Sequence, residues 1–329
     1  MDFKQIIGHE DIISRFISSI EADHVSHAYI ISGEEGSGRN TLAYCFAKTL
    51  QCESGSTEAC GQCKSCKQAE SGNHPDIIYI ESEEDKNIIP VKQIREELVG
   101  TMDIKPYSSR YKIYIIKGGE KMASDAQSAL LKTIEEPPEY GIVIILTTQP
   151  EKLLPTIRSR CVSVQTRPVK ETDIHNYLVG TLNVPEDKAR FAIEYSQGNL
   201  GKAIKLATNE EYEALVHLVV ALMSNIFEMD MEDITSTIQH AENYKMNIND
   251  FLDLMMMWYR DILVLKVTGN PDKIHFNDQY TTIRDQANYL SFNELEAKSK
   301  AITAAKERLD AKAKFEDIMR LLIMTLKEV

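Results

Sequence analysis

The sequence predicts an α/β domain with a parallel sheet, followed by a small group of short helices and an all-helical C-terminal domain. In the first half, short apolar runs alternate with segments of helical periodicity, whereas the second half has helical periodicity alone. Strands that are apolar throughout and separated by helices indicate a parallel sheet covered on both faces. The 329 residues correspond to two or three domains of roughly 150 residues.

Four short runs that are apolar throughout are expected to be the buried strands. They lie at 28–32, 77–80, 113–116 and 142–146. Helical segments between them include 91–98 and 123–134. Three short helices are expected next, at 171–179, 185–195 and 201–207.

Apolar stripes with helical spacing occupy the rest of the chain, at 215–226, 251–265 and 315–326. The ordinary interpretation of such stripes is core packing. Helical periodicity without a strand signal indicates a separate all-helical domain. We expect domain boundaries at 1–167, 168–208 and 209–329.

The charge balance argues against tight nucleic-acid binding by the chain alone. There are 37 basic and 50 acidic residues, for a net charge of -13, whereas such binding needs clustered Lys and Arg to displace counterions. A local basic face, or a DNA contact shared with other subunits, stays open. The first residues lack an apolar signal region, and no apolar run reaches the ~20 residues of a membrane span. We expect a cytoplasmic protein without a membrane partner.

A glycine-rich segment at 33–41 follows the first predicted strand and precedes a predicted helix, which is the context of a phosphate-binding loop. Glycines allow backbone N–H groups to turn toward phosphate, and the amino end of the helix adds a positive dipole. The candidate nucleotide-binding residues are Gly33, Gly36, Gly38, Arg39, Asn40 and Thr41.

This loop departs from the standard pattern G-x-x-x-x-G-K-[ST]. Arg39 stands at the Lys position, and its planar fork differs from a compact ammonium. Asn40 stands at the Ser/Thr position and lacks the hydroxyl that normally holds Mg²⁺. Thr41 is one residue along and points about 100° away around the helix.

A phosphate-loop NTPase also needs acidic residues at the end of a neighbouring strand, to hold the metal and prepare the water. The strand at 113–116 is followed instead by Lys117 and two glycines, and the first carboxylate is Glu120. A lysine at that place would repel Mg²⁺. We expect a fold that does not hydrolyse nucleotide. Weak nucleotide binding stays open, and an active ATPase with unusual residues is the alternative.

Four of the six cysteines, Cys52, Cys60, Cys63 and Cys66, fall within fifteen residues. Two-residue gaps let cysteines chelate one tetrahedral ion from a tight turn. A closed four-thiolate site has no open position, so the pattern predicts structural Zn²⁺. Redox chemistry and free thiols are the alternatives. His74, further along, is expected to be a surface or loop histidine.

Two arginines, Arg158 and Arg160, follow the last long predicted strand in a short helix or loop beyond the sheet. An arginine supplied in trans can stabilise the charge that develops during phosphoryl transfer. The alternative is that both are solvated surface residues.

Five motifs, in this order and spacing, resemble one family. They are the run 27–30 leading into the phosphate loop, the four-cysteine knuckle after the first helix, and the segments 129–138, 146–148 and 159–161. The chain resembles the delta-prime subunits of the bacterial DNA polymerase III clamp loader, which are members of the AAA+ superfamily. One departure is that the first cysteine gap is seven residues, where the family usually shows eight.

The resemblance implies three domains. These are a RecA-like AAA+ domain at 1–167 with the zinc knuckle at 52–66, a helical lid at 168–208, and a C-terminal helical collar, or oligomerisation domain, at 209–329. It also implies a non-hydrolysing stator within the DNA polymerase III holoenzyme. The implied partners are gamma/tau-type ATPase subunits and the delta subunit, with the sliding clamp and primer-template DNA in the complex.

The resemblance also implies roles for single residues. Arg160 would be an arginine finger acting on ATP held by a neighbouring subunit, with Arg158 the second candidate. Thr148 matches the sensor 1 position, and Gly201 aligns with the sensor 2 arginine of the motor subunits, with Lys202 beside it. Two other functions are weighed, a gamma/tau-type ATPase motor and a zinc-dependent nucleic-acid binder. The mixed charge around the knuckle disfavours the latter.

Overall fold

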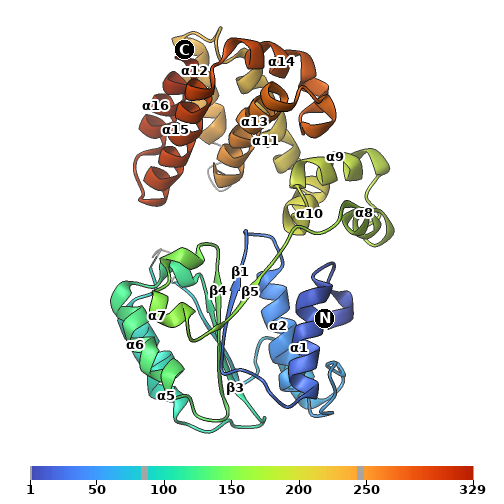
Figure 1. The fold of residues 1–329 in the computed structure, drawn as a ribbon, viewed down its shortest axis with the longest axis vertical. Helices are drawn as coiled ribbons and strands as arrows, with labels where there is room; N and C mark the ends of the chain where they lie inside the picture. The colour runs from blue at the N-terminus through green and yellow to red at the C-terminus, as the bar shows by residue number, and fades with distance from the viewer. Residues whose placement is uncertain (1, 83–87, 243–247, 329) are drawn as a thin grey trace. The chain divides into compact units, whose positions relative to one another are not determined.

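The computed structural model describes residues 2–82, 88–242 and 248–328 (Figure 1). The chain forms two compact units. The first contains Met1–Asn183 together with Ser196–Ala203, and the second contains Val184–Tyr195 together with Ile204–Val329.

The first unit is built on a five-stranded sheet in the order β2-β3-β4-β1-β5, in which every pairing is parallel. The strands are β1 (Ala28–Ser32), β2 (Ile77–Ile80), β3 (Lys112–Lys117), β4 (Gly141–Thr147) and β5 (Val162–Gln165). In the register of β1 with β4, Ser32 lies opposite Thr147. The carboxyl ends of these central strands therefore meet at one edge of the sheet, where the phosphate loop begins.

Helices cover both faces of this sheet, as Figure 1 shows for α1 and α2 on one side and α6 and α7 on the other. The longer helices are α1 (Glu10–Glu21), α2 (Arg39–Leu50), α3 (Lys64–Glu70), α6 (Ser124–Glu135) and α8 (Glu171–Gly180). Shorter pieces are α4 (Val91–Gln93), the π-helical η2 (Ile94–Val99), α5 (Gly100–Met102), α7 (Pro155–Arg158), and the 3-10 turns η1 (Phe3–Gln5), η3 (Gly119–Lys121) and η4 (Pro150–Lys152).

The alternation of side chains along the strands supplies two cores. Ile31 of β1 joins Phe16 of α1 and Phe46 of α2, whose rings stack with centroids 4.1 Å apart. Ile30, one residue earlier, joins Leu130 of α6 on the opposite face. Burying each such side chain stabilises the fold by about 1.5–3 kcal/mol. The sheet is thus covered on both sides, as the apolar strand runs predict.

The second unit is helical throughout its described residues. Its helices are α9 (Glu186–Ser196), α10 (Leu200–Thr208), α11 (Glu210–Asn225), α12 (Met231–Glu242), α13 (Ile248–Thr268), α14 (Tyr280–Tyr289), α15 (Phe292–Asp310) and α16 (Phe315–Lys327), with 3-10 turns η6 (Pro271–Lys273) and η7 (Asn277–Gln279). The end of α9 and the first four residues of α10 group with the first unit.

The core of the second unit is centred on Trp258 of α13, which is fully buried. Its indole N–H donates to Oε1 of Gln286 at 2.8 Å, and the Gln286 amide donates to the carbonyl of Met223 at 2.8 Å. These hydrogen bonds satisfy polar atoms that would be costly to bury alone.

The structure confirms the predicted α/β domain with a parallel sheet, followed by helical parts. All four predicted strands are present, and β5 was not predicted. It lies at the sheet edge, and Val164 is its one buried residue. A four-residue strand with three exposed side chains has no apolar run to reveal it.

No helix in the described part of the chain is long and apolar enough to cross a membrane.

Candidate functional site

The phosphate loop connects the carboxyl end of β1 to the amino end of α2. Gly36 and Gly38 adopt φ values of 84° and 88°, which lie in the left-handed region that favours glycine. Gly38 precedes the first turn of α2, which contains Arg39, Asn40 and Thr41. The structure therefore places all six candidate nucleotide-binding residues in one strand–loop–helix connection.

Three successive carbonyls of this loop accept hydrogen bonds from other parts of the first unit. The Asn199 amide donates to the Glu35 carbonyl at 2.8 Å, and the Gly201 backbone N–H donates to the Gly36 carbonyl at 3.0 Å. The His9 ring donates from Nε2 to the Ser37 carbonyl at 2.9 Å. The start of α10 is thus fastened directly to the phosphate loop.

Gly201 and Gly36 contact each other through their backbone atoms. A Cβ at Gly201 would lie 2.6 Å from Cα of Gly36 and 2.8 Å from its carbonyl oxygen. Only glycine fits, because backbone atoms cannot swing aside as a side chain can. Gly201, the residue expected at the sensor 2 position, therefore presents bare backbone to the loop.

Glu120, in η3, binds the residues at the end of β4. Its carboxylate accepts hydrogen bonds from the Thr147 hydroxyl at 2.7 Å and from the Thr148 hydroxyl and backbone N–H at 3.0 and 3.2 Å. Burial raises the pKa of Glu120, but these hydrogen bonds outweigh it and the net pKa is lowered. The hydroxyl of Thr148, the residue expected at the sensor 1 position, is therefore directed to this carboxylate.

Arg39 and Lys117 occupy the two positions at which a nucleotide hydrolase is expected to have its phosphate-binding lysine and its metal-binding carboxylate. Arg39 is half-buried, and burial lowers its pKa, partly offset by the carboxylates of Glu120 and Glu35. Lys117 ends β3, where its ammonium pairs with Glu81 at 3.1 Å and lies 5.0 Å from the Tyr79 ring centroid. A cation therefore occupies the place expected for a metal-binding carboxylate.

The two candidate finger residues lie around the end of α7. Arg160 forms an ion pair with Glu135 at 3.0 Å and donates to the Thr156 carbonyl at 3.1 Å. Arg158 is exposed and has no ion pair among the residues that the structure describes. Neither arginine is hydrogen-bonded to the described phosphate loop, which is compatible with action outside this chain.

The four cysteines come together as the spacing predicts. The Sγ atoms of Cys52, Cys60, Cys63 and Cys66 lie within 4.8 Å of one another, and all four thiols are free of disulfides. In a tetrahedral site with Zn–S distances near 2.3 Å the sulfur atoms are about 3.8 Å apart. The sulfurs of Cys60 and Cys66 are 4.0 Å apart.

Backbone N–H groups donate to three of the four cysteine sulfurs, whereas burial raises the pKa of the Cys66 thiol. The N–H groups of Cys60, Cys63 and Cys66 donate to the preceding cysteine sulfurs at 3.3–3.4 Å. Those of Gln62 and Cys63 lower the pKa of the Cys60 thiol to about 6. The donor set, spacing and hydrogen bonds therefore fit a closed tetrahedral metal centre.

A buried polar network supports the cysteine cluster from the sheet side. The Ser65 hydroxyl donates to the Gln51 carbonyl at 2.6 Å and lies 2.9 Å from Nε2 of His74. The Asp76 backbone N–H donates to Nδ1 of His74 at 3.1 Å, so Nε2 carries the proton. His74 lies in a loop as expected, but it is 4% exposed and not at the surface. Burial lowers its pKa.

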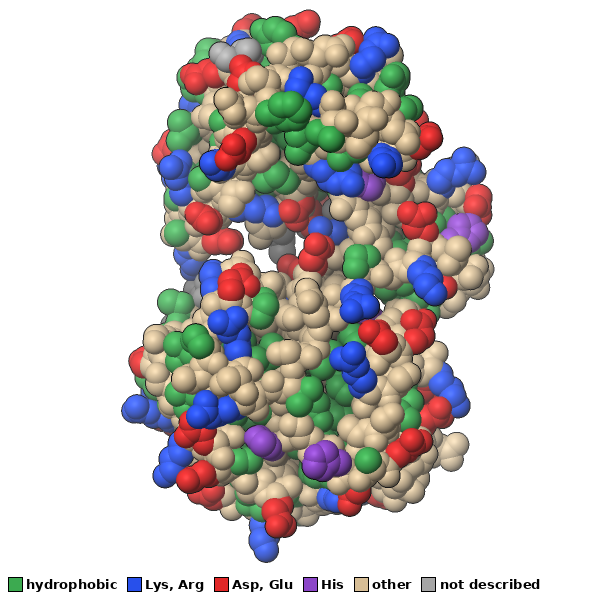
Figure 2. Space-filling view, in the orientation of Figure 1, with side chains coloured by type: hydrophobic (Ala, Val, Ile, Leu, Met, Phe, Trp, Pro, Cys, Tyr) green, Lys and Arg blue, Asp and Glu red, His purple; other side chains and the backbone are tan. Residues whose placement is uncertain are grey.

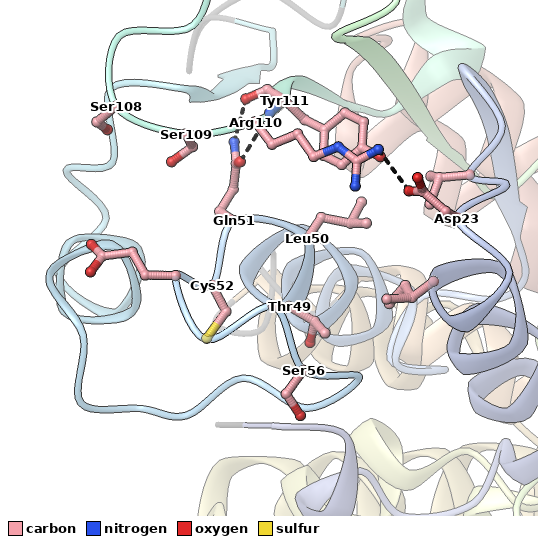
Figure 3. Close-up of a pocket in the computed structure, with 14 residues that line it drawn as sticks. Asp23, Thr49, Leu50, Gln51, Cys52, Ser56, Ser108, Ser109, Arg110 and Tyr111 are labelled. Carbon is pink, nitrogen blue, oxygen red and sulfur yellow. Dashed lines mark hydrogen bonds and ion pairs between the residues drawn. The ribbon is translucent and has the colours of Figure 1, made fainter.

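A hollow of about 380 Å³ lies beside the cysteine loop, and Figure 3 shows Gln51, Arg110 and Asp23 among the residues that line it. Arg110 pairs with Asp23 at 2.6 Å, and the Gln51 amide donates to the Tyr111 carbonyl at 2.6 Å. Tyr111 precedes β3, so the hollow lies at the amino ends of the strands. It is separate from the phosphate loop.

Known proteins that are similar to this chain cover the candidate site described above. A family model described as "DNA polymerase III, delta subunit" matches residues 8–170. DNA polymerase III subunit delta' of Bacillus subtilis is 28% identical over 96% of this chain and 95% of that protein. DNA polymerase III subunit tau/gamma of Haemophilus influenzae is 35% identical over 62% of this chain but only 30% of that protein.

Among solved structures, a DNA polymerase III gamma subunit-related protein from Thermotoga maritima matches with a TM-score of 0.46 and 16% identity. The match covers 96% of this chain and 98% of that protein. The family match and the near full-length relative agree: this chain is similar to the delta and delta' subunits of DNA polymerase III.

Proposed function

We propose that the chain is a non-hydrolysing stator subunit of a DNA polymerase III clamp loader, which helps to place the sliding clamp on primer-template DNA. The observation that carries the proposal is Lys117 at the end of β3, paired with Glu81. A positive charge there opposes Mg²⁺ binding, without which phosphoryl transfer lacks its metal. The nearby carboxylate of Glu120 is engaged by Thr147 and Thr148.

The degenerate phosphate loop then acts as a scaffold. Arg39 and Asn40 replace the residues that normally hold the β/γ-phosphates and the metal. The contact of Gly201 with Gly36 supports a loop held by protein groups. Any nucleotide bound by this chain itself would be weakly held.

Arg160 is proposed as an arginine finger supplied in trans to ATP on a neighbouring gamma/tau-type ATPase subunit. Its side chain is 41% exposed, so it is accessible to a partner. An arginine in this role stabilises charge that develops in the transition state. The further proposed partners are the delta subunit, the clamp and primed DNA, in the cytoplasm where replication proteins act.

The cysteine cluster is proposed to hold one structural Zn²⁺. Four sulfur ligands leave no position for substrate, so the ion would stabilise the knuckle and take no part in catalysis. A role of this knuckle in nucleic-acid recognition is disfavoured by charge. Within the knuckle, Glu53 and Glu58 offset Lys64. On the face of the first unit seen in Figure 2, Lys and Arg are likewise interspersed with Asp and Glu.

A first experiment measures Mg²⁺-dependent ATP hydrolysis by the purified chain. The expected result is no turnover above that of the Arg39→Ala variant, because the same contaminants would be present in both. Robust hydrolysis that is abolished by Arg39→Ala would show an active motor of the gamma/tau type and would contradict the proposal.

A second experiment tests the finger in a complex reconstituted with the ATPase and delta subunits, the clamp and primed DNA. Arg160→Ala is expected to slow single-turnover ATP hydrolysis at the adjoining site by roughly 10³-fold, while sites served by other subunits keep their rate. Arg158→Ala is measured beside it, because Arg158 is the second candidate and a loss confined to Arg158→Ala would assign the finger to that residue instead. Unchanged hydrolysis with Arg160→Ala would remove the assignment.

A further inference from the structure

The guanidinium of Arg160 is held by groups from two elements of the first unit. Glu135, the last residue of α6, accepts from Nη2 at 3.0 Å. Nη1 donates to the Thr156 carbonyl of α7 at 3.1 Å and lies 3.4 Å from the Ser159 hydroxyl. These contacts leave two of the five N–H donors of the guanidinium for another acceptor.

The two elements that hold Arg160 are fixed to each other. Ile134 of α6 and Ile157 of α7 are 1% and 0% exposed and belong to the same core. Gln127 of α6 donates to the Lys152 carbonyl at 3.2 Å and accepts from the Leu154 backbone N–H at 2.8 Å. The carboxylate of Glu135 is therefore placed relative to α7 by packing and hydrogen bonds.

The position of Glu135 along its helix also needs explanation. The carboxyl end of a helix carries the negative end of the dipole, where a carboxylate is disfavoured and a cation is favoured. The positive charge of Arg160 compensates both the Glu135 carboxylate and the negative end of the α6 dipole. Because ion pairs exposed to water contribute little to stability, a purpose in orienting the guanidinium is the better account of this pair.

We propose that Glu135 is a positioning residue for Arg160, which holds the guanidinium so that its remaining N–H groups face the terminal phosphate of a nucleoside triphosphate on the neighbouring subunit. This inference rests on the proposed finger role of Arg160. Glu135 does not touch the nucleotide. It restricts the rotamers of a long side chain, so that less conformational entropy is lost when the phosphate is contacted.

The test uses the reconstituted complex with Glu135→Gln, and with Glu136→Gln as matched control. Glu136 is the next residue, is exposed, and makes no side-chain hydrogen bond or ion pair among the described residues. Glu135→Gln is expected to lower kcat at the adjoining site roughly 2- to 5-fold, the kinetic equivalent of one exposed ion pair, with KM for ATP unchanged. Glu135→Asp should recover part of the loss, and Glu136→Gln should have no effect.

A double-mutant cycle separates positioning from any other role. Glu135→Gln is expected to have no further effect in the Arg160→Ala background, because the group that it positions is gone. An additional loss in that background, or a faster rate with Glu135→Gln alone, would overturn the inference. Thermal unfolding and size-exclusion chromatography of each variant would establish folding and assembly.

Failure of the inference and failure of the proposed function give different results. If Arg160→Ala slows hydrolysis and Glu135→Gln does not, the finger stands and the positioning role is wrong. If Arg160→Ala has no effect, the finger assignment is wrong and the role of Glu135 falls with it.

Discussion

Substitution of Gly201 by alanine tests the contact between the start of α10 and the phosphate loop. The new Cβ would lie 2.6 Å from Cα, 2.8 Å from O and 3.1 Å from C of Gly36. All three are backbone atoms. The helix start would have to move back by about 0.8 Å to reach ordinary contact at 3.4 Å.

That movement breaks two hydrogen bonds, from Gly201 N–H to the Gly36 carbonyl and from the Asn199 amide to the Glu35 carbonyl. Each contributes about 0.5–1.5 kcal/mol, so losing both costs about 1–3 kcal/mol, while the buried Asn199 amide keeps its 3.4 Å hydrogen bond to Glu34. Alanine recovers up to about 1 kcal/mol as the better helix former. The net expectation is a loss of up to about 3 kcal/mol in the free energy of unfolding.

Gly180→Ala is the matched control. Gly180 ends α8, and a Cβ added there would have nothing within 4 Å, so alanine should be neutral or slightly stabilising. Urea unfolding would compare the two variants, and hydrogen exchange over residues 33–41 would locate the effect in the phosphate loop. If Gly201→Ala equals or exceeds Gly180→Ala in stability, and exchange in the loop is unchanged, the reasoning from this contact is wrong.

Two further predictions concern the metal centre and Glu120. Metal analysis of protein purified without chelator should find about one zinc per chain, and Cys66→Ser should abolish it and lower the melting temperature, whereas Cys161→Ser should retain it. Zinc retained by Cys66→Ser would contradict the four-sulfur site. The pKa of Glu120 is lower in the folded chain, so its contribution is complete above the unfolded pKa of about 4.5 and is lost as pH falls through the folded value. Glu120→Gln should therefore lower the free energy of unfolding by about 1–2 kcal/mol at pH 7 and by less at pH 3, as measured by urea unfolding. An equal loss at both pH values would contradict this assignment.

Much of the fold could be predicted because its signals are local. Apolar runs at β1, β2, β3 and β4 reveal buried strands, since a strand covered on both faces has no polar side to break the run. The cysteine cluster is equally local, because two-residue gaps bring thiols together in any tight turn. β5 escaped prediction because its side chains are mostly exposed.

The contacts of the functional site join residues that are distant in the sequence, and only the tertiary structure decided them. The sequence alone determined that the phosphate loop lacks its lysine and hydroxyl, because residue types at fixed spacing carry that information. It could not reveal that Glu120 binds Thr148, that Gly201 packs on Gly36, or that Glu135 pairs with Arg160. These partners lie 25 to 165 residues apart. Which of them meet depends on the order of the strands and on how the helices pack over the sheet, and no periodicity along the chain encodes that.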